Sequence, residues 1–104
     1  MLPRGIGHTS LMIANLPDGK ATIVYPTRDI AREVTKRVHL ERPTTAHQYK
    51  HVIIRDFDDV DVLDGLSEPV FFDNSFWALV DLETAVAATE RAAIASRHRH
   101  FTTH

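Results

Sequence analysis

Three short apolar runs occur along the chain, each followed by a longer stretch of mixed polarity. The run Ala21–Tyr25 predicts a buried strand, and Val52–Ile54 and Val70–Asp73 predict two more. Between the first two runs, apolar side chains recur every four residues from Ile30 to Val38. That spacing predicts an amphipathic helix with one face packed against a sheet.

Two further helices are predicted toward the ends of the chain. Residues 1–10 contain the glycines of a loop, and Thr9–Leu16 predicts a short helix that stops before the turn residues 17–19. An alanine-rich segment from Asp81 to about Arg97 predicts a long final helix, because alanine has the highest helix propensity.

Strands that alternate with helices indicate a mostly parallel sheet covered on both faces. We therefore predict an α/β fold, with three layers and three to four short strands. The chain has 104 residues, enough for one domain with its own core, so residues 1–104 are expected to form a single small domain.

Composition and charge narrow the class of protein. The absence of cysteine excludes disulfides, thiolate metal sites and a cysteine nucleophile. A formal net charge of −2 does not favour strong non-specific binding to nucleic acid. No segment has the ~20 apolar residues that a membrane-spanning helix needs, and the first residues lack the pattern of a signal peptide. We therefore expect a cytoplasmic protein with no membrane contact.

The first segment with candidate chemistry is Gly5-Ile6-Gly7-His8-Thr9-Ser10, where the first helix is predicted to begin. Glycines let backbone N–H groups approach a phosphate, and a helix N-terminus adds a positive partial charge. The candidate phosphate-binding residues are therefore Gly5, Gly7, His8, Thr9 and Ser10. A plain glycine turn is the alternative interpretation.

Two other segments follow predicted strands. The first, Pro26-Thr27-Arg28-Asp29-Ile30-Ala31, directly follows Ala21–Tyr25, and the alternative for it is an ordinary turn with Thr27 as a helix cap. The second is Val70-Phe71-Phe72-Asp73-Asn74, an apolar strand that ends in an aspartate. By itself, such an aspartate is mostly structural.

Taken in order, these three segments resemble those of a P-loop NTPase. The chain is similar to a RecA-like lobe, as in phage-encoded P-loop ATPases and the first lobe of DEAD-box-type helicases. Gly7 and Thr9 match the end of the P-loop, Thr27 and Arg28 match the P-T-R-E-L-A segment, and Asp73 matches the Walker B aspartate. The resemblance spans residues 5–74 and implies a reduced P-loop NTPase-like fold.

The same resemblance implies ATP with Mg²⁺ as ligands that folding does not require. Thr9 and Asp73 would hold the metal, and Thr27 and Arg28 would contact nucleic acid or a partner. The departures from the P-loop family pattern argue against efficient catalysis. His8 replaces the P-loop lysine and is mostly neutral at pH 7, since an unperturbed histidine has a pKa near ~6.5. Asn74 follows the aspartate where a catalytic glutamate often stands, and only four residues precede Gly5, too few for a full strand.

Two functions remain open. The departures favour a non-enzymatic or nearly inactive P-loop-derived accessory protein of phage or mobile-element type, which acts by binding a partner in the host cytoplasm. The alternative is a nucleotide- or phosphate-binding protein with weak Mg²⁺-dependent NTPase activity, linked to nucleic-acid processing. No catalytic residue is assigned in either case.

An incomplete sheet would leave an apolar edge open to another chain. We therefore expect a homodimer or a dedicated protein partner, joined through strands or through Phe76 and Trp77.

Overall fold

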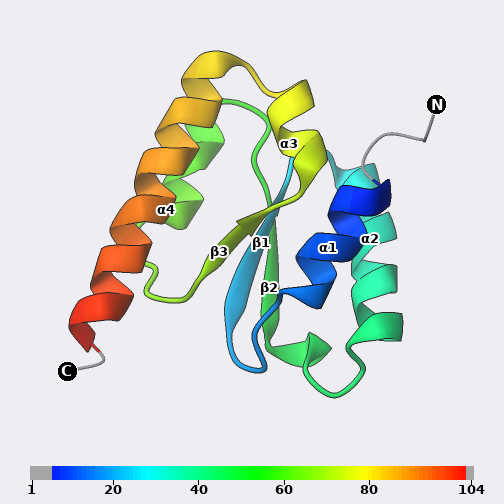
Figure 1. Ribbon diagram of the computed structural model, residues 1–104. Coiled ribbons are helices and arrows are strands. Elements are labelled where there is room, and N and C mark those ends of the chain that lie inside the picture. The colour runs from blue at the N-terminus through cyan, green and yellow to red at the C-terminus, as the bar shows by residue number, and fades with distance from the viewer. Residues whose placement is uncertain (1–5, 103–104) are drawn as a thin grey trace.

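The computed structural model describes residues 6–102, and the side chains of residues 8–97. Seven regular helices and strands and two 3₁₀ segments make up this part of the chain (Figure 1). In chain order they are α1 (Ile6–Ala14), β1 (Ala21–Tyr25), α2 (Arg28–Glu41), η1 (Ala46–Gln48), β2 (Tyr49–Ile53), η2 (Phe57–Leu63), β3 (Val70–Phe72), α3 (Asn74–Leu79) and α4 (Leu82–Thr102).

The described strands form one parallel sheet in the order β2-β1-β3. In its register, Ile23 at the centre of β1 lies between His51 of β2 and Phe71 of β3. All five residues of β1 are buried, because this strand has a neighbour on each side and helices over each face. The predicted α/β class with a parallel sheet of three to four strands is therefore confirmed.

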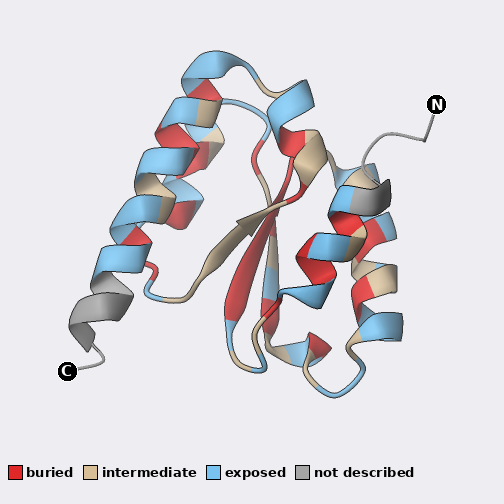
Figure 2. Ribbon diagram, viewed as in Figure 1, coloured by how far each residue is buried: buried red, intermediate tan, exposed pale blue. Residues whose placement is uncertain are grey.

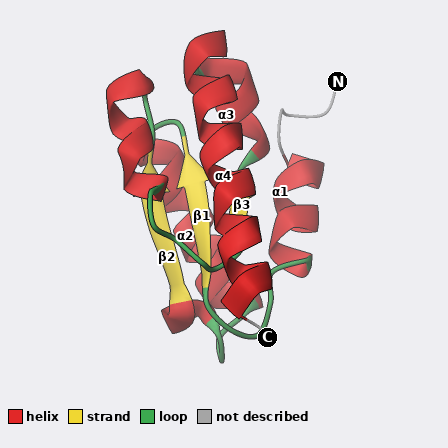
Figure 3. Ribbon diagram, turned by 90° about the vertical axis from the view of Figure 1, so that its left-hand side faces the viewer, coloured by secondary structure: helices red, strands yellow, loops and turns green. Residues whose placement is uncertain are grey.

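Helices cover both faces of the sheet (Figure 3). Helices α1 and α2 pack on one face around Ile23, Tyr25 and Val38, and α4 packs with η2 on the other face around Val24 and Ile54. Figure 2 shows the buried positions of each helix turned toward the sheet. Two apolar clusters, one per face, therefore make up the core.

Helix α2 forms as its hydrophobic spacing predicts. Ala31, Val34 and Val38 are buried on one face. The Thr27 hydroxyl accepts a hydrogen bond from the backbone N–H of Ile30 over 3.2 Å, which confirms the predicted helix cap.

Several predicted boundaries are wrong. Helix α1 begins at Ile6 and ends at Ala14, so Gly7 lies in a helix where a loop was expected. Strand β2 starts at Tyr49, earlier than predicted. The polar Lys50 and His51 interrupt the apolar run, so the start of the strand was not visible in the sequence. Strand β3 ends at Phe72, because Asp73 already caps a helix.

Two helical features differ from the sequence-based expectation. Helix α3 (Asn74–Leu79) was not predicted, because six residues are too few to show helical periodicity. Helix α4 continues to Thr102, past the predicted end near Arg97. No helix in residues 6–102 combines the length and the apolar character needed to cross a bilayer.

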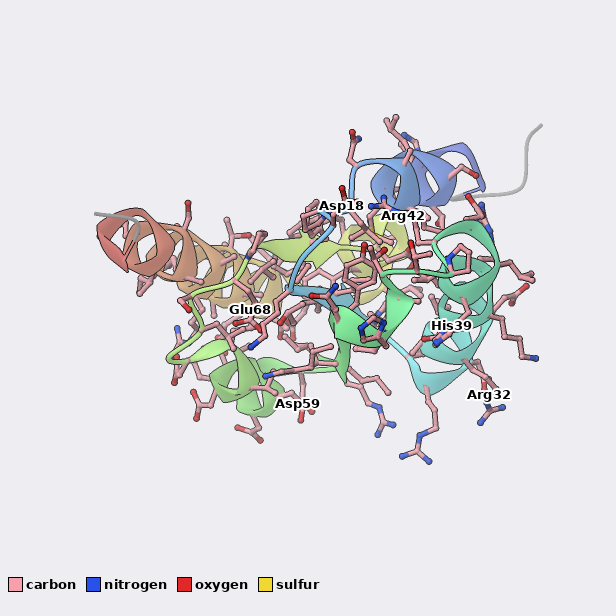
Figure 4. The ribbon with its side chains drawn as sticks, turned by 90° about the horizontal axis from the view of Figure 1, so that it is seen from below. Asp18, Arg32, His39, Arg42, Asp59 and Glu68 are labelled. Atoms are coloured by element: carbon pink, nitrogen blue, oxygen red, sulfur yellow. The ribbon has the colours of Figure 1, made fainter. Side chains whose placement is uncertain are left out.

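Arg42, directly after α2, holds the loop that joins α1 to β1. Its guanidinium donates to the backbone carbonyls of Ile13 at 2.9 Å and Pro17 at 3.3 Å, and pairs with the Asp18 carboxylate at 3.0 Å (Figure 4). The Tyr49 hydroxyl also donates to the Pro17 carbonyl. These bonds fix the loop between α1 and β1, and with it the position of α1 over the sheet.

Candidate functional site

The candidate site lies at the carboxyl ends of the strands, where α1 begins and β3 ends. The Thr9 hydroxyl donates a hydrogen bond of 2.9 Å to Oδ1 of Asp73. Both side chains are buried, Thr9 to 5% and Asp73 to 2% exposure. The two predicted metal ligands are therefore adjacent in the folded chain, although they are far apart in sequence.

The Asp73 carboxylate has further partners on its own side of the site. Its Oδ2 accepts from the backbone N–H of Ser75 at 3.2 Å and from the Ser75 hydroxyl. Asp73 thereby caps the N-terminus of α3 while it holds Thr9 of α1. Each carboxylate oxygen has a protein donor, and the pair joins α1, β3 and α3 at one point.

The predicted phosphate-binding segment lies in and before the first turn of α1. Gly7 and His8 are helical residues, and His8 is exposed. Ser10 is half-buried, and its hydroxyl accepts a hydrogen bond from the guanidinium of Arg37 on α2. Gly5 lies outside the described residues. The side chains of Thr9 and Ser10 are therefore engaged by the protein itself.

Thr27 and Arg28 follow β1, the neighbouring strand, so they lie at the same edge of the sheet. The Thr27 hydroxyl is occupied by its helix cap, whereas Arg28 is exposed at the first position of α2. Of this predicted contact pair, Arg28 is the residue with a solvent-facing side chain.

The predicted contact residues Phe76 and Trp77 have opposite environments. Phe76 is fully buried in the core against α4, so of the predicted pair it has no exposed surface to offer a partner. The Trp77 side chain is 45% exposed. Its ring stacks at a tilt on Phe72, with centroids 4.8 Å apart, and meets Phe76 edge-on at 5.1 Å.

A pocket of about 290 Å³ is lined in part by the sequence neighbours of Thr9 and Asp73, namely His8 and Asn74. It lies between α1, β3 and α3, and its wall is mostly apolar. The residues that contribute are His8, Leu11, Met12, Asn15, Phe71, Phe72, Asn74 and Trp77. Of the α1 residues in this wall, the sequence analysis singled out only His8; it did not assign a surface role to Leu11, Met12 or Asn15.

A second polar pair, also missed from the sequence, lies on the α2 side of the sheet. The Tyr25 hydroxyl and Nδ1 of His51 are 2.7 Å apart, and the two rings stack with centroids 5.7 Å apart. Burial, and secondarily the nearby His39, lowers the pKa of His51. Burial is also the main reason that the pKa of Tyr25 is raised. Both groups are therefore held neutral.

Metal binding by protein ligands alone has little support in the described part of the chain. Among the described side chains, those of residues 8–97, no group of three or more His, Asp or Glu is placed to share a metal ion. Thr9 and Asp73 offer one hydroxyl and one carboxylate, which suits a Mg²⁺ ion that keeps most of its water and also binds phosphate. In the observed arrangement, these two groups bond to each other.

The chain was compared with family models, curated proteins and solved structures. None of the three comparisons gives a match.

Proposed function

We propose that this chain is a non-hydrolysing, P-loop-derived cytoplasmic protein that acts by binding a partner. The observation that carries the proposal is the burial and hydrogen bonding of the Asp73 side chain. Its two oxygens are satisfied by Thr9 and Ser75, and its side chain is 2% exposed. A carboxylate that binds Mg²⁺ through water needs access to solvent and free lone pairs. Asp73 instead links α1 to α3 through its hydrogen bonds to Thr9 and Ser75.

The identities of His8 and Asn74 also support the loss of phosphoryl transfer. Phosphoryl transfer needs positive charge on the γ-phosphate and a group that orients the attacking water. His8 stands in the place of the P-loop lysine, and Asn74 is an amide that cannot take a proton. The partner-binding half of the proposal is supported by Trp77 and Leu11, whose apolar side chains are exposed on either side of β3.

A second candidate function is the binding of a nucleotide or phosphate with Mg²⁺. The specific observation in its favour is the contact between Thr9 and Asp73, because a hydroxyl beside an aspartate at the carboxyl edge of a parallel sheet is the pair a P-loop protein uses for its metal. Binding would require Mg²⁺ to replace the hydrogen bond between the two side chains.

Phosphate release and calorimetry on the purified chain, with ATP and Mg²⁺, separate the two candidates. We expect no phosphate release above that of a matched blank and no heat of ATP binding. Asp73→Asn removes the negative charge, and its one amide oxygen can still accept from Thr9, although the amide nitrogen then faces the Ser75 N–H. Its fold is checked by circular dichroism before the comparison. A rate on the order of one turnover per second that disappears in Asp73→Asn would refute the proposal. Saturable, Mg²⁺-dependent heat without turnover would favour the second candidate.

A further inference from the structure

Strand β3 lies at an edge of the described sheet. It pairs with β1 on one side, and no described strand pairs with its other side. The opposite edge strand, β2, carries the exposed charge of Lys50, the kind of residue that discourages pairing at an edge. The three side chains of β3 are apolar and half-buried: Val70, Phe71 and Phe72. The two edges of the sheet therefore differ in character.

The hydrogen bonds to β1 define which backbone groups of β3 face outward. The N–H of Asp73 donates to the Val24 carbonyl at 3.0 Å, and the Pro69 carbonyl accepts from Thr22 at 2.9 Å. Because peptide groups alternate in direction along a strand, the N–H and C=O groups of Val70 and Phe72 point away from β1. These four groups form a short ladder at the open edge.

The space beside this ladder has an apolar wall on each face of the sheet. Figure 3 shows the strands in the order β2, β1 and β3, with α1 beyond β3 on the open side. On that face, Leu11 is 62% exposed and lines the pocket together with Met12 and Phe71. On the other face the pocket is bounded by Phe72 and by the half-exposed ring of Trp77.

We propose that the open edge of β3 receives an extended apolar segment of another polypeptide as a fourth strand. The ladder on Val70 and Phe72 has no backbone partner among the described residues. It identifies the ligand as backbone in an extended conformation, because a strand is the partner that satisfies alternate peptide groups. Apolar walls on both faces require apolar side chains on both sides of the incoming strand. The inference rests on the proposed partner-binding function and names the class of partner.

A synthetic peptide with the sequence of β1 is a suitable probe. Ala-Thr-Ile-Val-Tyr already pairs with β3 in parallel and is buried on both faces within this fold. The probe carries terminal lysines for solubility. Trp77 is the single tryptophan of the chain, and it lies against Phe72 at the edge. Its fluorescence therefore reports occupancy, and we expect a saturable blue shift as the peptide is added to the full chain.

Val70→Pro tests whether backbone pairing holds the peptide. It removes an outward N–H without removing a bond to β1, and proline is tolerated at a strand edge. Val70→Ala is the control, because it shortens the side chain and keeps the N–H. We expect affinity to fall about tenfold in Val70→Pro relative to Val70→Ala. Equal affinity in the two variants, or no blue shift with wild-type protein, would overturn the proposal.

Two methylated peptides give the same test on unaltered protein, in case Val70→Pro does not fold. One is N-methylated on the first, third and fifth residues of the β1 sequence and the other on the second and fourth. We expect one peptide of the two to lose binding, since alternate amides face β3. Equal binding by both would point to side-chain contacts alone and contradict strand addition.

A second copy of this chain is the competing occupant of the edge. Light scattering that gives about twice the 11.8 kDa chain mass, and a single-chain mass for Val70→Pro, would assign the edge to self-pairing and overturn the proposal. Phosphate release from ATP is measured separately. Its detection would refute the proposed loss of hydrolysis and leave the peptide result unchanged, so the two failures are distinguishable.

Discussion

The hydroxyl of Thr9 and the carboxylate of Asp73 are joined by a 2.9 Å hydrogen bond across a sequence separation of 64 residues. Thr9 lies at the end of the first turn of α1, and Asp73 lies between a strand and the next helix. Because both are buried, the bond matters for stability as well as for any ligand. Its removal leaves a buried carboxylate oxygen without that donor.

Thr9→Val replaces the hydroxyl by a methyl group of similar size. We expect the free energy of unfolding to fall by about 1–3 kcal/mol, because the Asp73 oxygen loses its donor while it stays buried. Denaturant unfolding followed by circular dichroism measures the change. Thr9→Ser keeps the hydroxyl, so its free energy of unfolding should fall clearly less than that of Thr9→Val. Equal stability of Thr9→Val and wild type would show that water replaces the bond.

His8→Lys tests whether the start of α1 retains the shape of a phosphate site. His8 is exposed in the first turn, so a lysine there adds a full positive charge without disturbing the core. If phosphate binds at this turn, calorimetric titration should show affinity for ATP with Mg²⁺ raised about tenfold or more. His47→Lys adds the same charge to η1, at the other end of the sheet. No measurable affinity in either variant would mean that this turn is not a phosphate cradle.

Phe76 and Trp77 are neighbours in sequence, but we expect their replacement by alanine to lower the free energy of unfolding by different amounts. Phe76→Ala should destabilise the fold by about 3–5 kcal/mol, because a fully buried ring is replaced by a cavity. Trp77→Ala should cost markedly less, since nearly half of that side chain already faces solvent. Thermal unfolding of the two variants checks the order. A larger loss in Trp77→Ala would contradict the assignment of Trp77 to the surface.

His51 should make stability depend on pH. Its pKa is lowered in the folded chain, so below its ordinary value of about 6.5 the unfolded chain binds more protons than the folded chain. The free energy of unfolding therefore falls as the pH falls from about 7 to about 5. The Nε2 atom is buried and has no partner in the described residues, which agrees with a neutral ring.

His51→Gln is the variant that isolates this effect, because its amide oxygen can still accept from the Tyr25 hydroxyl. We expect a shallower dependence of unfolding free energy on pH in His51→Gln than in wild type. His47→Gln changes an exposed histidine and should keep the wild-type slope. Parallel curves for wild type and His51→Gln would show that other groups set the pH dependence.

Local patterns in the sequence were sufficient for part of the fold. The strand Ala21–Tyr25 has the predicted bounds, and the helix after it has the predicted buried face and the predicted cap at Thr27. These features depend on neighbours within a few residues, so periodicity and capping chemistry reveal them. The alternation of strands and helices also led to the parallel sheet, because a parallel connection needs a crossover of helical length.

The environment of each candidate residue was decided by the tertiary structure. The sequence placed Thr9 and Asp73 in one site only through resemblance, and it could not show that each bonds to the protein itself. It also could not separate Phe76 from Trp77, since both are aromatic and only the packing of α3 on α4 and β3 buries one of them. Burial and hydrogen bonding between distant segments depend on how the helices and strands pack. Two adjacent residues of the same type do not reveal which of them that packing will bury.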